Sequence, residues 1–412
     1  MKRVYLFTIL ILFTQAIALE WVFRDSVEVP VTRTAAVTDG EKIYLICGNT
    51  MLPETSYSRV QVYLPGTDSW YIADLVHPGG GVHNHDAEII GRKIYVGGGS
   101  RRSAYYNNLT VINLGDNTWT VVGAMPENNL LYYEFEVADN KIYLFGGAPD
   151  GSTPINRVWC FDTTTNTWTQ RAAMPQALRD VAAARIGDTI YTFGGFRDAN
   201  YTAVNACYAY SITGNNWVTK TSMPTARGWA TAHILLHPDS GPMVFVCGGQ
   251  SGSNTYYNTV ERYSVWYGTW ATQTPMNRMR RSHGGVVLGC SLFVISGYAV
   301  SRPFLASVER GFAPEFVGLK EMTKKEASFS LRVTPNPING MMKVSFFLPG
   351  KEKVRIKLYS PDGNLIKTLF DGEGAPGNRI LSFPTQGLPS GIYFLKLTTG
   401  NLVGVKKVIL NP

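Results

Sequence analysis

The chain has few residues of the kinds that metal centres and catalytic clusters use. It contains five cysteines and six histidines among 412 residues. It has no Cys-x-x-Cys pair, no His-Glu-x-x-His motif, no phosphate-binding loop and no recognisable Ser-His-Asp arrangement. The five cysteines are odd in number and lie in or beside expected strands at unrelated positions. A disulfide framework needs tighter spacing, so we expect small, buried, apolar cysteines with at most one bridge.

Long apolar runs are also missing, except at the start of the chain. Lys2 and Arg3 precede an apolar run at residues 4–13, and Ala16 and Ala18 form a small-x-small cleavage site. This pattern predicts a secretory signal peptide over residues 1–18. The run is shorter than the roughly 20 residues of a membrane-spanning helix, which makes an uncleaved anchor the weaker interpretation. We therefore expect an exported mature chain without a transmembrane helix.

The net charge of +8 is unevenly distributed. Residues 319–412 hold 14 Lys and Arg against 6 Asp and Glu, whereas residues 19–318 hold 22 against 24. The basic character therefore belongs to the C-terminal part, and residues 19–318 carry −2. Because no basic stripe lies on the larger part of the chain, the composition argues against a nucleic-acid partner.

A hydrophobic stretch that ends in glycine recurs six times with a period near 50 residues. Its last glycines are Gly48, Gly99, Gly147, Gly195, Gly249 and Gly297, separated by 51, 48, 48, 54 and 48 residues. A tryptophan after a polar turn follows each of the first five copies, at Trp70, Trp119, Trp168, Trp217 and Trp270, and a Met-Pro pair often comes next. A period of this length predicts the blades of a β-propeller, with tryptophans packed between blades.

These three markers, in order and in register, resemble the kelch repeat over residues 20–315. The resemblance implies an all-β, six-bladed kelch-like propeller, which we assign to residues 19–315. The sixth copy has no tryptophan after it, but Trp21 lies 49 residues before Trp70 and Pro30 follows it. We therefore expect residues 20–27 to supply the outer strand of the last blade, which leaves no open sheet edge between the two ends of the ring.

The repeat stops at residues 316–327, which we interpret as a linker. Seven short alternating segments follow within residues 328–412 and predict a small immunoglobulin-like β-sandwich. Residues 334–337 (Thr-Pro-Asn-Pro), 388–393 and 405–410 of this region resemble the type A sorting domain of the type IX secretion system. That resemblance implies contact with the secretion machinery, passage across the outer membrane of a Gram-negative bacterium, and then removal of the domain or its exchange for a surface glycolipid. A plain immunoglobulin-like accessory domain is the alternative.

The loops after the second strand of each blade share one face of a propeller, together with the connections between blades. Rigid strands that present variable loops form the default binding face, and tyrosine and arginine anchor such surfaces. The candidate binding residues in these loops are Arg101, Arg102, Tyr105, Tyr106, Arg197, Tyr201, Tyr256, Tyr257, Tyr298 and Arg302. An alternative is that several of the tyrosines only cover blade edges.

Four carboxylates fall at matching positions of two adjacent inner strands. Asp86 and Glu134 each lie 13 residues before the last glycine of their repeat, and Glu88 and Glu136 lie 11 before it. Alternation along a strand places each pair on one face, toward the propeller axis. The mutual repulsion of the carboxylates requires compensation by arginine (Arg33, Arg179, Arg227 or Arg281), by a divalent cation, or by protonation, which acid–base catalysis would use. The alternative is a purely structural role, in which the carboxylates form a salt-bridged or solvated channel lining.

Three histidines, His77, His83 and His85, cluster beside a glycine run. They are weak candidates for a copper or zinc site, because their spacing is loose. His283 occupies the same repeat position as His85, so both are expected near the axis.

Three functions remain open from the sequence. The first is an extracellular or cell-surface module that binds a glycan or a protein, without a cofactor. The second is a carbohydrate-active enzyme of the sugar epimerase or oxidase type that uses the inner carboxylates, an analogy drawn from the fold alone. The third is a structural role in adhesion. The sequence leaves enzymatic activity undecided, and binding is favoured.

Overall fold

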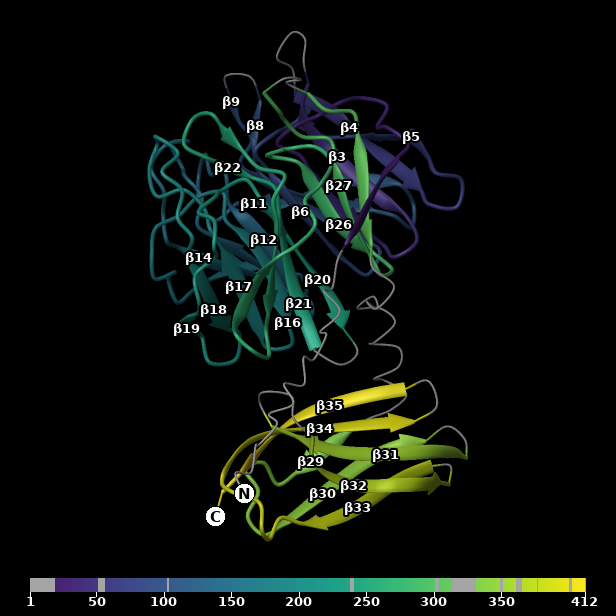
Figure 1. Cartoon of the computed structure of the whole chain (residues 1–412). Coiled ribbons are helices and arrows are strands. Elements are labelled where there is room, and N and C mark those ends of the chain that lie inside the picture. Colours follow the sequence, from purple (N-terminus) through teal and green to yellow (C-terminus); the bar gives the residue numbers. More distant parts are fainter. Residues whose placement is uncertain are drawn as a thin grey trace, which may run out of the picture.

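The computed structural model describes residues 19–50, 56–101, 104–237, 241–300, 304–312, 331–348, 351–360, 365–375, 377–399 and 402–411. The expected signal peptide (1–18) and linker (316–327) lie outside the described residues. All regular elements described are strands, and none of the described segments is a helix long and apolar enough to cross a membrane. Figure 1 shows a ring of sheets formed by the purple to green part of the chain, and a smaller yellow-green sandwich.

Six four-stranded antiparallel sheets form the ring, as predicted for a kelch-like propeller. The first five sheets each take their strands in chain order, from the axis outward. They are β2 (Ala35–Thr38), β3 (Ile43–Asn49), β4 (Ser56–Leu64) and β5 (Ser69–Val76); β6 (Asp86–Ile90), β7 (Lys93–Gly97), β10 (Asn108–Asn113) and β11 (Thr118–Ala124); β12 (Glu134–Ala138), β13 (Lys141–Phe145), β14 (Val158–Asp162) and β15 (Thr167–Arg171); β16 (Ala182–Ile186), β17 (Thr189–Phe193), β18 (Cys207–Ser211) and β19 (Asn216–Thr219); and β20 (Thr231–His237), β21 (Gly241–Cys247), β24 (Val260–Ser264) and β25 (Thr269–Thr272).

The sixth sheet combines both ends of the ring. Its inner strands are β26 (Gly284–Leu288), β27 (Ser291–Ile295) and β28 (Val308–Phe312), and its outer strand is β1 (Glu20–Arg24). Strand β1 pairs with β28 in antiparallel register, with Trp21 opposite Gly311. A Cβ at Gly311 would lie 2.8 Å from the indole ring of Trp21, so glycine makes room for that ring. The chain thus closes the ring with its first described strand.

The repeated tryptophans lie between neighbouring sheets. The indole N–H of Trp217 donates to the carbonyl of Ala172 in the preceding sheet at 2.9 Å, and its ring packs 5.1 Å from that of Tyr210. Equivalent tryptophan bonds to the preceding blade recur at Trp21, Trp70, Trp168 and Trp270. The repeated glycines are needed for a related reason: Gly146 has φ +60°, and a Cβ there would lie 2.2 Å from the carbonyl oxygen of Leu178 in the next sheet. The sequence markers therefore record contacts between blades.

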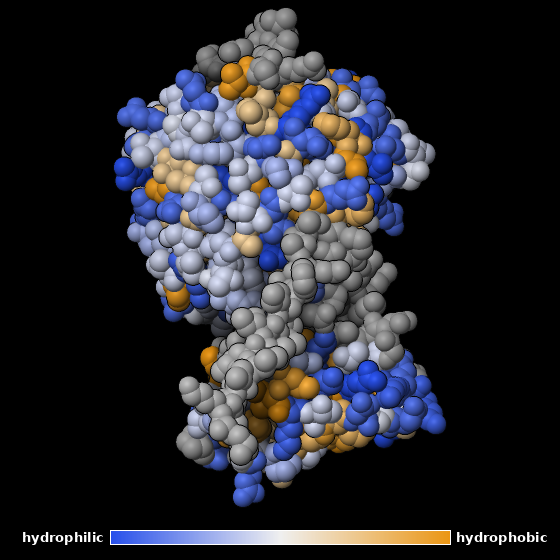
Figure 2. Space-filling view, in the orientation of Figure 1, coloured by the Kyte–Doolittle hydropathy of each residue, from blue (hydrophilic) through white to orange (hydrophobic). Residues whose placement is uncertain are grey.

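Two small hairpins extend the loops after the second strands. These are β8 (Ser100–Arg101) with β9 (Ala104–Tyr105), and β22 (Gln250–Ser251) with β23 (Thr255–Tyr256). All five cysteines are free, so no disulfide bond links the blades. Cys290 is half-buried and the other four are buried. Burial raises the pKa of the Cys47 and Cys247 thiols to about 12, which keeps both protonated. The side of the propeller seen in Figure 2 is mostly hydrophilic, with hydrophobic side chains scattered over it.

The C-terminal region is a β-sandwich with its own core. One sheet contains β29 (Arg332–Thr334), β30 (Met341–Leu348) and β33 (Gly377–Pro384), and the other contains β32 (Leu365–Gly374), β31 (Glu352–Tyr359), β34 (Gly391–Thr399) and β35 (Leu402–Leu410). Buried Val344, Phe346, Ile356 and Leu395 belong to the core between them. This arrangement agrees with the fold expected from the seven short alternating segments.

Removal of the closing strand should destabilise the whole propeller. A chain that begins at residue 29 loses Leu19 and Trp21, both buried, and exposes the edge of β28. Because loss of one buried tryptophan side chain costs about 3–5 kcal/mol, we expect Tm to fall by about 10 °C or more relative to a chain that begins at residue 19. Differential scanning calorimetry of the two chains tests this. A Tm within 2 °C of the parent would show that β1 is dispensable.

Candidate functional site

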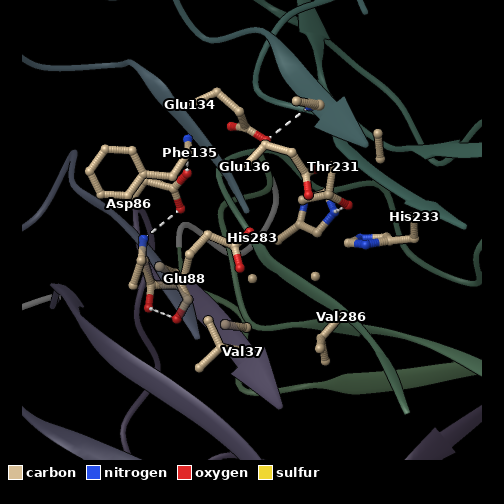
Figure 3. Close-up of a pocket in the computed structure, with 18 of the residues that line it drawn as sticks. Val37, Asp86, Glu88, Glu134, Phe135, Glu136, Thr231, His233, His283 and Val286 are labelled. Atoms are coloured by element: carbon tan, nitrogen blue, oxygen red, sulfur yellow. Dashed lines mark hydrogen bonds between the residues drawn. The ribbon is translucent and has the colours of Figure 1, made fainter. Parts of the chain in front are cut away.

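A central cavity of about 380 Å³ lies on the propeller axis. The six inner strands surround it, and their side chains alternate between the cavity and the sheet interior. Two positions of each inner strand lie at matching register. At these positions the cavity is lined by Ala35 and Val37, Asp86 and Glu88, Glu134 and Glu136, Ala184, Thr231 and His233, and Gly284 and Val286, whereas Ala182 is buried in the core. At this register polar groups gather on β6, β12 and β20 (Figure 3), and Arg185 adds a cation from β16.

Asp86 and Glu134 join neighbouring inner strands to each other. A carboxylate oxygen of Asp86 accepts a hydrogen bond from the backbone N–H of Phe135 at 2.6 Å, and Glu134 accepts one from Ala183 at 3.0 Å. In both cases the donor lies 49 residues further along the chain, in the next sheet. Burial raises the pKa of Asp86 to about 7 and that of Glu134 well above its ordinary value. These two residues therefore have an evident role in holding blades together.

Glu88 and Glu136 have no such partner in a neighbouring blade. Each accepts only a hydrogen bond of 3.2–3.3 Å from the N–H of its own following residue. Burial raises the pKa of Glu136 to about 8. Burial, followed by repulsion from Glu136 and Asp86, raises the pKa of Glu88 well above its ordinary range. Burial therefore favours the protonated form of both carboxyls, and a protonated carboxyl can both donate and accept hydrogen bonds in the cavity.

None of the four arginines suggested as counter-charges forms an ion pair with the inner carboxylates among the described residues. Arg227 is fully buried and pairs with Glu261 at 3.0 Å inside the fifth sheet, and Arg179 pairs with Asp180 at 2.7 Å. Neither arginine neutralises the four inner carboxylates. Of the three modes of compensation that the sequence left open, the raised pKa values of the four carboxyls favour protonation.

The fifth inner strand adds two polar groups that the sequence analysis missed. Thr231 and His233 line the cavity on β20, and Figure 3 shows His233 facing the space that Glu88 and Glu136 also enter. Burial lowers the pKa of His233 to about 4, so its imidazole is neutral. Counting back from Gly249 failed here because the β20–β21 hairpin is longer than the others. Counting forward from the Met-Pro pair would have found Thr231, since it follows Pro224 by seven residues as Ala182 follows Pro175.

A closed ring of six backbone hydrogen bonds surrounds one end of the cavity. In this ring each N–H donates to the carbonyl of its counterpart in the preceding blade, at 2.7–3.5 Å. All six residues have φ between 47° and 61°, in the left-handed region. They are Arg33, Asn84, Tyr132, Asp180, Trp229 and Ser282. Residues joined in this way lie about 5 Å apart, so a ring of six has a radius of about 5 Å. We call this narrow, fixed opening the channel mouth.

Arginines and aromatic rings alternate across the fourth, fifth and sixth blades at the channel mouth. The guanidinium of Arg179 lies 5.0–5.9 Å from the ring centroids of Tyr132, Phe196, Tyr201 and Trp229. The guanidinium of Arg281 lies 4.2 Å from Trp229, 4.6 Å from Tyr298 and 5.5 Å from Tyr256. Trp229 therefore separates two cations. Phe196 and Trp229 are buried, whereas Tyr132, Tyr201, Tyr256 and Tyr298 are half-buried, and we call this cluster the platform.

The predicted binding-face residues divide between this platform and other places. Tyr201, Tyr256 and Tyr298 belong to the platform. Arg101 and Tyr106 contact each other on the second blade, with the guanidinium 5.7 Å from the ring. Tyr105 is exposed in the β8–β9 hairpin, Arg197 is exposed in the fourth blade, and Tyr257 is half-buried. Arg102 and Arg302 lie outside the described residues.

The three clustered histidines bind separate partners. The Nδ1 atom of His77 accepts the N–H of Gly79, and its ring packs edge-on against Tyr106. Both nitrogens of His83 bond serine hydroxyls, and His85 and His283 reach back to the preceding blade, at Ile46 and Thr231 respectively. Burial lowers the pKa of His77 and His83 to about 4 and that of His85 to about 3. Within the described residues, no three His, Cys, Asp or Glu side chains are grouped to hold a metal ion.

Comparison with known proteins agrees with this architecture. The closed ring of six sheets defines a kelch-type propeller. The KLHDC2/KLHL20/DRC7 Kelch-repeats domain matches residues 84–297, and the chain belongs to the kelch-repeat family. A secretion system C-terminal sorting domain, of the type IX system, matches residues 332–411. A structure titled "Structure of YjhT" is similar in fold, with a TM-score of 0.59 and 15% identity over 69% of this chain and 95% of that chain. No curated protein matches the chain.

Protonation of the cavity carboxyls predicts a pH-dependent stability. Because burial raises the pKa of Glu136 to about 8, the native state retains a proton that the unfolded chain releases near pH 4. The native state then binds more protons between about pH 4 and 8, so the free energy of unfolding falls as pH rises through this window. For Glu136→Gln we expect Tm to rise by about 2–5 °C at pH 9, with no gain at pH 5.

Thermal unfolding at both pH values measures this effect. Glu41→Gln, in the exposed turn between β2 and β3, is the control and should change Tm at neither pH. Equal shifts for the two variants would argue against a protonated Glu136.

Proposed function

We propose that the protein is an exported carbohydrate-binding protein whose ligand occupies the channel mouth. The observation that carries this proposal is the cluster of aromatic rings and arginines beside a cavity that polar side chains line. Sugars combine apolar C–H faces, which stack on Tyr and Trp, with hydroxyls that need both donors and acceptors. Protonated Glu88 and Glu136 and neutral His233 supply donors and acceptors without the desolvation cost of fixed charges.

A glycan suits this site better than a folded protein partner does. The platform borders the narrow ring of six backbone groups, and the hydrogen bonds of that ring hold it in one conformation. Such a concave, preformed site favours a slender ligand over a flat protein surface. A protein partner or an adhesive role would instead use the exposed loop tips, where Tyr105 and Arg197 lie.

Export follows from the C-terminal region. The sorting domain indicates that the chain is secreted or attached to the cell surface through the type IX secretion machinery. We propose that residues 1–18 direct the first step of export as a signal peptide, on the basis of their basic start, apolar run and cleavage site. The ligand is then an extracellular glycan.

Aromatic substitutions at the channel mouth should reduce glycan binding selectively. We expect Tyr298→Ala and Tyr256→Ala each to raise Kd about tenfold, because each removes a stacking face. Isothermal titration calorimetry against a panel of neutral and acidic oligosaccharides measures this. Tyr71→Ala, at an exposed position of the outer strand β5, is the control and should leave Kd unchanged. Platform variants that bind like the control would move the site away from the mouth.

Catalysis on the bound sugar is a second candidate function. The observation that favours it is the presence of protonated Glu88 and Glu136 and neutral His233 around one cavity. A proton donor and a proton acceptor around one ligand suit proton transfer at a sugar carbon, as in epimerisation. Glu136→Gln should then reduce turnover at least 100-fold and leave Kd for the sugar within about threefold.

Nuclear magnetic resonance of sugar anomers and epimers follows this reaction directly. His233→Asn provides the second variant, since it removes the proposed acceptor on the opposite wall. If neither variant changes the rate at which the sugar equilibrates, the cavity groups bind without catalysing.

A further inference from the structure

Two arginines at the channel mouth have no acidic partner among the described residues. Arg33 and Arg281 make no ion pair there, whereas Arg179 and Arg227 are each paired with a carboxylate within 3.0 Å. Arg33 and Arg281 adjoin each other through the backbone ring, since the N–H of Arg33 donates to the carbonyl of Ser282 at 2.8 Å. The mouth thus carries two guanidinium groups that form no ion pair with a described carboxylate, although Asp180 attracts Arg33 at longer range.

Aromatic rings cover the faces of the Arg281 guanidinium, while its N–H edge makes few hydrogen bonds. Trp229 and Tyr298 stack against the guanidinium at 4.2 and 4.6 Å. Its Nε is buried without a hydrogen-bond partner, and its side-chain hydrogen bond among the described residues is a long one of 3.4 Å from Nη1 to the hydroxyl of Ser282. Aromatic stacking leaves the planar fork of N–H donors free to bind two oxygens of one anion. A buried N–H without an acceptor is unfavourable, and a ligand oxygen would relieve that cost.

Arg33 lies in the mouth itself. Its backbone has φ 57°, a conformation disfavoured for a residue with a Cβ, and its side chain lines the cavity without a hydrogen bond to any described residue. Burial raises the pKa of Asp180 and of Tyr132, and the positive charge of Arg33 opposes both rises. The guanidinium therefore acts across the opening, on groups of the third and fourth blades.

Burial reduces the negative charge of the carboxyls below the mouth, and it raises the pKa of Asp86 to about 7. Burial raises the pKa of Glu88 and Glu134 well above the ordinary range, and that of Glu136 to about 8. Asp180 is paired with Arg179 at 2.7 Å. The local charge at the mouth is therefore positive, although residues 19–318 as a whole carry −2.

From this arrangement we infer that the glycan ligand is acidic: a carboxylate or sulfate on the sugar is bound by the guanidinium edge of Arg281 and by Arg33. The sugar ring attached to that group lies against Tyr298 and Tyr256. This inference rests on the proposed carbohydrate-binding function and narrows its ligand to oxyanion-bearing glycans. A planar carboxylate and a tetrahedral sulfate each present two oxygens to the N–H donors of arginine. Only direct comparison of the two kinds of ligand therefore distinguishes them.

Matched pairs of ligands test the inference. The chain from residue 19 to 412 is titrated with hexagalacturonate and with its carboxyl-reduced galactose counterpart, and with chondroitin hexasaccharides with and without sulfate. We expect the oxyanion form of at least one pair to bind about tenfold or more tightly than its counterpart, with Kd rising between 50 and 300 mM NaCl. The pair that shows the preference identifies the anion as carboxylate or sulfate.

Arginine variants locate the anion. Arg33→Gln, which breaks no described side-chain bond, and Arg281→Gln should each weaken the acidic ligand about tenfold and change the binding of its neutral counterpart less than twofold. Arg281→Lys keeps the charge but loses the fork, and it replaces Arg281→Gln if that variant does not fold. Arg59→Gln, an arginine of β4 paired with Asp74 at the surface, is the control. Equal binding of acidic and neutral glycans by parent and variants overturns this inference while glycan binding stands, whereas a failure of every glycan to bind overturns both.

Discussion

The closed ring of six backbone hydrogen bonds is the constraint on which the functional part of this propeller depends. Each blade contributes one residue in the left-handed conformation, and each residue bonds to its counterpart in the preceding blade. A ring of this kind closes only if all six inner strands start at the same height around the axis. At the sixth blade the ring is closed by Ser282, which bonds to Arg33 and Trp229. The pairing of β1 with β28 completes the outer edge of the same sheet.

Burial around the axis then determines the electrostatics of the cavity. Water has limited access to the inner strands, so ionised carboxylates there would be poorly solvated and close to one another. Burial favours the protonated form of these carboxyls, while the buried arginines Arg227 and Arg280 pair with Glu261 and Glu309 inside the sheets. The result is a hydrogen-bonding interior of reduced negative charge below a positively charged mouth. The cavity can bind hydroxyl groups and the mouth can bind an anion, so a sugar that carries one oxyanion matches both zones.

The sequence predicted the features that repeat and missed those that depend on neighbours in space. The glycine and tryptophan markers act locally at each blade boundary, so their spacing predicted six sheets and the closing strand. The same register placed Asp86, Glu88, Glu134 and Glu136 on the axis. The longer β20–β21 hairpin hid Thr231 and His233, since it shifted the count from Gly249. The stack of Arg179, Trp229 and Arg281 joins residues about 50 positions apart at points where the sequence repeat is not conserved from blade to blade, so no linear pattern identifies it.

In each acidic pair, one carboxyl has a structural role and the other is available to a ligand. The first member of each pair, Asp86 or Glu134, accepts an N–H from the next inner strand, and the fold alone accounts for a side chain with an oxygen at that position. The second member, Glu88 or Glu136, accepts only the N–H of its own neighbour and faces the cavity. An apolar residue would cost the fold little there, as Val37 and Val286 show at the same register in other blades. The presence of two half-buried carboxyls where valine also fits is therefore better explained by what enters the channel than by the stability of the ring.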